Sequence, residues 1–184
     1  MSPFRHYFAL LLFVLPIDFA NVGVLGENST PCFRLWEVIS VERIERAVFA
    51  KLNGYNCAES VVTAFADDFG IDHDNAMKLA CGLGGGLGGQ GLACGALTGA
   101  TILFGLIHGR TEPEDVEAKK KTYARVHAAA EEFRAIHGNV NCVSLLGGSM
   151  EGAIASGLNK TLCPKLVRTA CELVERELRE SGKG

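Results

Sequence analysis

Residues 81–109 read CGLGGGLGGQGLACGALTGATILFGLIHG, and this stretch decides the fold. It contains half of the 22 glycines of the chain. It also lies in a run without Asp, Glu, Lys or Arg that extends from Lys78 to Arg110. A run this apolar must be buried, either in lipid or in protein, so the other segments are expected to pack around it.

The second half of this stretch, residues 92–107, is apolar almost all round and predicts a helix. Gly91, Gly95 and Gly99 recur every four residues, a spacing that lets another backbone approach one side of a helix closely. The length is marginal for a bilayer, and the flank on the glycine side carries no polar anchors. We therefore expect the central helix of a bundle.

The composition indicates one globular domain and excludes a nucleic-acid partner. A chain of 184 residues with 48% hydrophobic side chains can bury a sizeable core. The net charge is −3, and no basic block is long enough to form an electrostatic footprint for nucleic acid. The triplet Lys119–Lys121 follows a group of acidic residues, which is typical of a solvated helix face.

The first part of the chain differs from the rest. Residues 8–15 form an apolar run of signal-peptide length that is too short to span a bilayer. We interpret residues 1–39 as a hydrophobic N-terminal arm and linker, with a signal or anchor and a start site upstream of the true domain as alternatives. Residues 40–184 are the predicted domain. A reducing cytoplasm is the expected compartment, and export or membrane anchoring through residues 8–15 is the alternative.

Spacing and capping signals divide the domain into helices. Val41, Ile44, Val48 and Leu52 recur at helical spacing and predict the buried face of the first helix. The expected helices are 40–52, 57–69, 72–83, 92–107, 111–137 and 163–178, with a helical turn at 142–146 and an irregular loop at 147–159. No segment is typical of a strand. The fold class is all-α, a compact bundle of about six helices around the Gly-rich apolar helix.

The chemistry is expected at four of the seven cysteines. Cys57, Cys142 and Cys163 each stand at a predicted helix N-terminus, and Cys94 stands in the first turn of the glycine-rich helix. Free N–H groups and the helix dipole favour a thiolate there, which predicts lowered pKa values and raised reactivity or metal affinity. The competing interpretation is a set of small buried side chains.

The other three cysteines are weaker candidates. The interpretation as a small buried side chain fits Cys171 best, because this residue lies in the middle of a helix on its apolar face. Cys32 in the linker is expected to be incidental, and Cys81 is ambiguous because it leads directly into the glycines.

Spacing leaves the use of the four thiols open. There is no CxxC pair, so the zinc-ribbon and ferredoxin patterns are absent, and the four cysteines can converge either as ligands or as two redox pairs. The glycines match the dinucleotide pattern, but a helix precedes them, which argues against nucleotide binding. We expect instead a tight loop with free N–H groups beside Cys94 that could bind cluster sulfurs, a thiolate or a small anion. The candidate cofactor-binding residues are Gly86, Gly88, Gly89, Gly91 and Gly95.

Taken together, these residues resemble a known family. Cys94-Gly95-Ala96-Leu97-Thr98-Gly99 is similar to the CGAxxG signature of a bacterial family of redox-active proteins labelled C_GCAxxG_C_C. Its other cysteines match Cys57, Cys142 and Cys163, and the resemblance spans residues 44–178. It implies a redox role, an iron–sulfur or other prosthetic group, and partners among oxidoreductases or transporters. Some members carry a twin-arginine export signal, and this chain has no Arg-Arg before its apolar run.

Three functions follow as hypotheses. In the first, Cys57, Cys94, Cys142 and Cys163 meet at one site and hold an iron–sulfur cluster or related metal centre for electron transfer. The second is a thiol–disulfide oxidoreductase or redox relay without metal, with Cys94 as the attacking thiolate. The third is a non-catalytic accessory protein of an oxidoreductase or transporter, with structural or zinc-binding cysteines.

Overall fold

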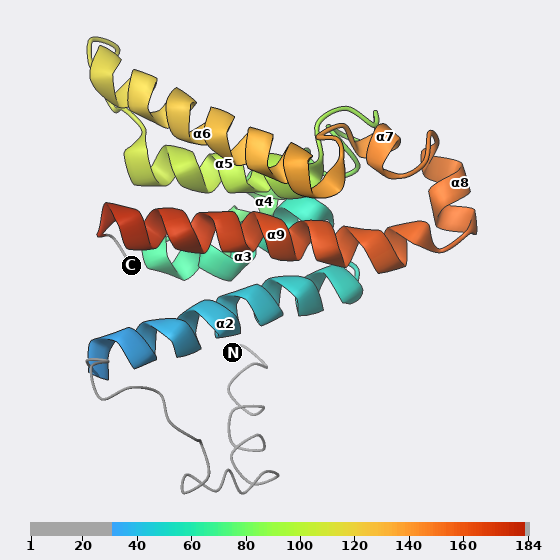
Figure 1. Ribbon diagram of the computed structural model, residues 1–184, viewed down its shortest axis with the longest axis horizontal. Helices are drawn as coiled ribbons and strands as arrows, with labels where there is room; N and C mark the ends of the chain where they lie inside the picture. The colour runs from blue at the N-terminus through green and yellow to red at the C-terminus, as the bar shows by residue number, and fades with distance from the viewer. Residues whose placement is uncertain (1–30, 183–184) are drawn as a thin grey trace, which may run out of the picture. The chain divides into compact units, whose positions relative to one another are not determined.

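The computed structural model describes the backbone of residues 31–182 and the side chains of residues 37–182. Contacts divide the chain into Met1–Arg34 and Leu35–Gly184, and the fold described is that of the second unit. The helices are α2 (Pro31–Leu52), α3 (Cys57–Phe65), α4 (His73–Cys81), α5 (Gly95–His108), α6 (Val116–His137), α7 (Cys142–Leu145), α8 (Met150–Ala155) and α9 (Leu158–Ser181), with a 3-10 turn, η2 (Ala66–Phe69) (Figure 1). No strand occurs in residues 31–182, so the predicted all-α class is confirmed.

Helix α5 lies between α3, α9 and α6, as expected for a central helix (Figure 1). Its contact with α3 depends on two glycines. A methyl group added at Gly99 would lie 3.0 Å from the carbonyl oxygen of Ala58 and 3.2 Å from Cβ of Val61. One added at Gly95 would lie 3.2 Å from Cβ of Cys57. Small residues at this spacing therefore bring the two backbones together, as predicted.

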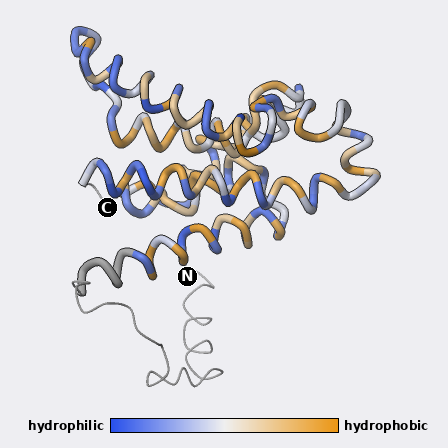
Figure 2. The backbone as a smooth tube through the Cα atoms, viewed as in Figure 1, coloured by the Kyte–Doolittle hydropathy of each residue, from blue (hydrophilic) through white to orange (hydrophobic). Residues whose placement is uncertain are grey.

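The faces of α6 and α9 that point to α5 complete the core. The predicted stripe of α9 is fully buried, and it consists of Val167, Ala170, Cys171, Val174 and Leu178. On α6, Phe133 is buried and Val126 packs against the same cluster, whereas Tyr123, predicted on the stripe, is exposed. Figure 2 shows the difference in hydropathy: α5 is coloured almost entirely hydrophobic, and α6 alternates between hydrophilic and hydrophobic residues.

Helix α2 buries only part of the predicted face: Ile44 and Val48 are half-buried, and Ile44 packs against the core. Val41 and Leu52 are 59% and 61% exposed, and the helix instead turns Arg43 and Ala47 inward. The reason is a buried ion pair: Arg43 Nη1 lies 3.2 Å from Glu175 Oε1 on α9. A second carboxylate, that of Asp68, lies 2.6 Å from Arg43 Nη2. Pairing with two carboxylates from other elements overrides the apolar pattern of the helix.

Several predicted boundaries are wrong. Helix α2 starts at Pro31, within the expected linker. Helix α5 starts at Gly95 rather than residue 92, because the glycine loop continues to Ala93. Helix α6 starts at Val116, where Asp115 accepts from the Ala118 N–H, and not at the Thr111–Pro113 signal. Helices α8 and α9 occupy much of the expected loop 147–159.

Within the described residues, no helix combines the length and apolar character that crossing a bilayer requires. Residues 8–15 and the side chain of Cys32, for which the sequence suggested an anchor and an incidental thiol, lie outside the described part of the chain.

Candidate functional site

Helices α3, α5, α7 and α9 begin at the same end of the bundle, where the glycine loop and α8 also lie (Figure 1). Cys57 is the first residue of α3, Cys94 caps α5, and Cys142 is the first residue of α7. Cys163 differs from expectation: it lies inside α9, which begins at Leu158. All four thiols are buried and belong to one core cluster.

Local hydrogen bonds hold Cys57 in place. The Asn56 side chain accepts from the N–H groups of Ala58 and Glu59, and the Glu59 carboxylate accepts from the Asn56 N–H. This is the predicted capping box, and it sets the first turn of α3. The Asn56 amide also donates to the carbonyl oxygen of Cys81, which ties α3 to the end of α4.

Backbone pairing brings Cys94 and Cys142 together. Ala93 and Asn141 form an isolated antiparallel bridge. On its two sides, the Cys94 N–H donates to the carbonyl of Val140 (2.8 Å) and the Cys142 N–H donates to the carbonyl of Leu92 (2.5 Å). Main-chain hydrogen bonds thus hold Cys94 and Cys142, which are far apart in the sequence, on two neighbouring backbone segments.

The glycine loop makes room for this pairing. Gly86 has φ +70°, and a methyl group there would lie 2.7 Å from Cβ of Cys142. Gly91 has φ +74°, and a methyl group there would lie 2.8 Å from Cβ of Val143. Gly88, with φ +60°, lies in the same loop. Neither Gly88 nor Gly91 belongs to α5.

The predicted free donors are partly used within the loop. The Gly89 N–H donates to the carbonyl of Gly84, and the Gly91 N–H donates to the carbonyl of Gly85, each at 3.0 Å. These two glycines therefore shape the loop and do not present their N–H groups to a sulfur. Gly95 serves the contact between α3 and α5.

The thiols of Cys57 on α3 and Cys163 on α9 are close enough to change each other's pKa. The interaction with Cys57 lowers the pKa of Cys163 to about 7, and the ammonium group of Lys51 favours the same thiolate. The interaction with Cys163, together with burial, raises the pKa of Cys57 well above its ordinary value. Near neutral pH Cys57 therefore keeps its proton, and Cys163 is divided between thiol and thiolate.

The other two thiols stay protonated. Burial raises the pKa of Cys94 to about 11, although the N–H groups of Ala96 and Leu97 at the start of α5 oppose this shift. Burial, followed by the charge of Cys163, raises the pKa of Cys142. The predicted lowering at helix starts is therefore wrong for Cys57, Cys94 and Cys142. The loss of water is the main cause for Cys94 and Cys142, and the interaction with Cys163 is the main cause for Cys57.

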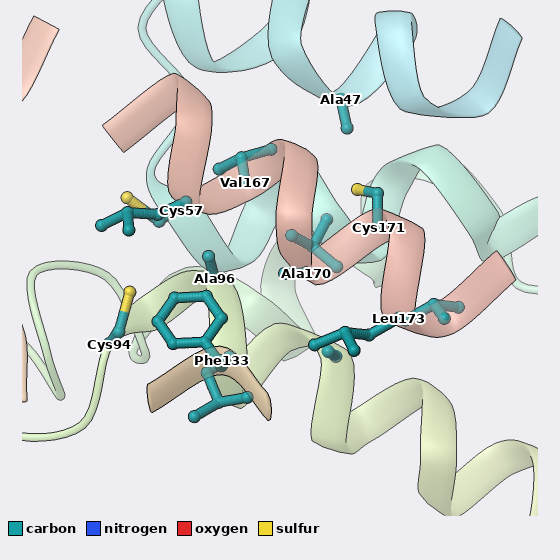
Figure 3. Packing of buried hydrophobic residues seen from close by; sticks show 14 of the residues in the cluster. Ala47, Cys57, Cys94, Ala96, Phe133, Val167, Ala170, Cys171 and Leu173 are labelled. Atoms are coloured by element: carbon teal, nitrogen blue, oxygen red, sulfur yellow. The ribbon is translucent and has the colours of Figure 1, made fainter. Parts of the chain in front are cut away.

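Cys81 and Cys171 lie outside this group. Cys171 is fully buried farther along α9, on the side toward Ala47, whereas Cys57 and Cys94 lie together near Ala96 (Figure 3). Cys81 is exposed, and the nearby Glu59 carboxylate raises the pKa of its thiol.

Sequence reasoning missed Lys51, which lies in the last turn of α2. A lysine there is ordinary, since cations are favoured at helix C-termini. Only the return of α9 past the end of α2 places it beside Cys163, so no local pattern indicates its role.

Four thiolates are the donor set of iron–sulfur clusters and of structural zinc sites. As the side chains stand, however, no three Cys, His, Asp or Glu groups among the described residues are placed to hold a metal ion. The donor chemistry suits such a centre, and the placement of the side chains does not form one.

The fold and the site define an all-helical protein with four buried thiols at one end. The chain belongs to the C_GCAxxG_C_C family, described as "Putative redox-active protein (C_GCAxxG_C_C)", whose family model matches residues 55–177. The match contains all four cysteines and confirms the resemblance carried by the CGAxxG hexapeptide. No curated protein and no solved structure matches the chain.

Proposed function

We propose that the protein is a thiol–disulfide redox protein in which Cys163 attacks and Cys57 resolves. The observation that carries this proposal is the burial of the two thiols in one core cluster, where each changes the pKa of the other across α3 and α9. The family's redox character gives independent support. Cys94, the attacking thiol expected from the sequence, is less suited, because burial raises its pKa to about 11.

The pair can exchange with a disulfide in two steps. The Cys163 thiolate attacks one sulfur of the substrate, the substrate S–S bond breaks, and one half leaves as a thiolate. Cys57 then loses its proton to that thiolate and attacks Sγ of Cys163, which forms the Cys57–Cys163 bond and releases the second half. The two cysteine sulfurs of the protein lose two electrons, and the substrate disulfide is reduced to one thiol, which carries the Cys57 proton, and one thiolate.

A second candidate is a metal or iron–sulfur centre on Cys57, Cys94, Cys142 and Cys163. It is favoured by the electrostatic coupling among the thiols: Cys94 interacts with Cys57, Cys142 and Cys163. Forming such a centre requires the side chains to move, since the described residues hold no ready group of three ligands. When bound, a cluster would supply one-electron chemistry.

One experiment separates the two candidates. The protein is purified without oxygen, analysed for iron, zinc and sulfide, and then equilibrated in glutathione redox buffers before alkylation and peptide mass spectrometry. We expect a reversible disulfide between Cys57 and Cys163 in metal-free protein. Cys163→Ser should abolish it, and the control Cys81→Ser, at an exposed thiol, should not.

Stoichiometric iron with sulfide, or zinc, together with no reversible disulfide would overturn the dithiol proposal in favour of the metal centre. Disulfide formation that survives Cys163→Ser through other thiols would refute the assigned pair.

A further inference from the structure

A pocket opens between the end of α2 and the first turns of α9, and Pro164, the residue after Cys163, is part of its lining. Its volume is about 290 Å³, at the small end of the range typical of ligand pockets. Its lining residues are Lys51, Leu52, Gly54, Asn159, Lys160 and Pro164.

The lining is basic and contains a side-chain oxygen without a hydrogen-bond partner among the described residues. It contains two lysines and no acidic residue. Neither Lys51 nor Lys160 forms an ion pair with another residue of the described chain, although Lys51 Nζ donates to the carbonyl of Tyr55 (3.1 Å). Asn159 Oδ1 is buried and has no hydrogen-bond partner among the described residues. A buried acceptor left in this state is costly and calls for a donor.

Helix geometry connects the pocket to Cys163. Asn159 and Lys160 precede Cys163 by four and three residues in α9, so they lie on the same face one turn away. Pro164 follows it directly. Lys51 is close enough for its charge to act on both thiols of the pair. The pocket therefore adjoins the turns of α9 on either side of Cys163, although neither thiol lines it.

A second groove, between α6 and α9, lacks these properties. Its cations are Arg125 and Arg176, and they pair with Glu177, Glu180 and Glu132, which line the same groove. The charges there neutralise one another, so that groove offers no comparable attraction to an anion.

We propose that the pocket formed by Lys51, Asn159 and Lys160 binds the substrate of the redox pair and selects a small disulfide that carries carboxylate groups and an N–H donor. The lysines would attract the carboxylates, and the N–H group would satisfy Asn159 Oδ1. This inference rests on the proposed function, because it assigns the substrate class of the same site.

The test measures how fast the reduced protein forms the Cys57–Cys163 disulfide with three probes of different charge. They are glutathione disulfide, which is anionic and has amide and ammonium donors, neutral 2-hydroxyethyl disulfide, and cationic cystamine. Each rate is divided by the rate of the same probe with dithiothreitol, which removes differences in intrinsic reactivity. We expect the normalised rate to be highest with the anionic probe, lower with the neutral probe and lowest with the cationic probe. These differences should become smaller as the salt concentration rises.

Lys160→Gln should slow the reaction with glutathione disulfide about three- to five-fold, the factor that one charge pair at about 4 Å is worth in water. Its rate with 2-hydroxyethyl disulfide should not change. The matched control is Lys165→Gln, because Lys165 is exposed on the opposite face of α9 from Cys163 and outside the pocket lining. It should leave all three rates unchanged.

The outcomes separate the two proposals. Equal normalised rates for the three probes, or equal effects of Lys160→Gln and Lys165→Gln, would overturn the pocket assignment and leave the dithiol function standing. Failure of every probe to form the disulfide would overturn the dithiol function, and the substrate assignment with it.

Discussion

The fit between the glycine loop and Cys142 can be tested with a single methyl group. Gly86→Ala places a Cβ 2.7 Å from Cβ of Cys142 and 2.7 Å from the backbone nitrogen of Leu92. Real Cβ atoms do not approach other heavy atoms this closely, so the loop or α7 has to shift. The matched control is Gly89→Ala, because Gly89 has a similar φ of +82° and no atom within 4 Å of its added methyl group.

Both variants place an alanine at a positive φ, and only Gly86→Ala also creates a steric clash. An alanine in the left-handed region costs about 1–2 kcal/mol, partly offset by about 0.4–1 kcal/mol from a stiffer unfolded chain. Gly89→Ala should therefore lose about 1 kcal/mol. Gly86→Ala adds overpacking, which costs about 1–3 kcal/mol, so its total loss should be about 2–4 kcal/mol.

The assay is urea unfolding followed by far-ultraviolet circular dichroism under reducing conditions. A second readout is the alkylation rate of Cys142, which should increase in Gly86→Ala and stay unchanged in Gly89→Ala. Equal losses of stability in the two variants would refute the reasoning, because the close approach to Cys142 would then carry no free energy.

Three further predictions concern buried groups. Iodoacetamide labelling of Cys163 should rise with pH around a midpoint near 7, and Cys57→Ala should move that midpoint upward because the interaction with the Cys57 thiol lowers the pKa of Cys163. Cys171→Ser places a hydroxyl at a fully buried site and should lower the free energy of unfolding in urea by about 1–3 kcal/mol without slowing disulfide formation. Arg43→Met leaves Glu175 buried without this partner and should cost about 3–5 kcal/mol at pH 7 in the same assay. The loss should be smaller at pH 5, since burial already raises the pKa of Glu175 and protonation removes the charge. A labelling midpoint near 9, a slow disulfide in Cys171→Ser, or a loss in Arg43→Met that does not change with pH would contradict the respective prediction.

Features that depend on neighbouring residues could be predicted from the sequence. The capping box of Asn56 and Glu59 places Cys57 at the start of α3, as the pattern indicated. The period of Val167, Val174 and Leu178 correctly predicted the buried face of α9. Both signals lie within a few turns of one helix, and no distant residue has to be known.

Features that depend on distant partners could not be predicted. Arg43 is buried because carboxylates of η2 and α9 meet it, and the local pattern of α2 favoured the opposite face. Helix α9 begins before Cys163 because Gly157, in the left-handed conformation, starts it earlier, and Pro164 is accepted within its second turn. The Cys-Pro pair therefore misled the prediction of the helix start.

The pKa values of the cysteines also depend on distant residues and could not be predicted from the local sequence. A helix start is a local feature and favours a thiolate, but burial is a property of the whole fold and favours the thiol. For Cys94 the two effects oppose each other, and burial wins. Cys163 has a lowered pKa without a helix start, because Cys57 and Lys51 approach it from other helices.

This distribution of protons bears on the choice between the two candidate functions. Cys163 is the one thiol of the four that has a lowered pKa, and the raised values keep Cys57, Cys94 and Cys142 protonated near neutral pH. Attack on a disulfide needs a single thiolate, and the Cys57 proton serves the leaving group. A metal centre on all four sulfurs must first release the remaining protons, so its affinity would fall steeply as pH falls. The directions of these pKa shifts thus favour thiol–disulfide exchange, whereas metal binding would have to overcome the raised pKa values of three thiols.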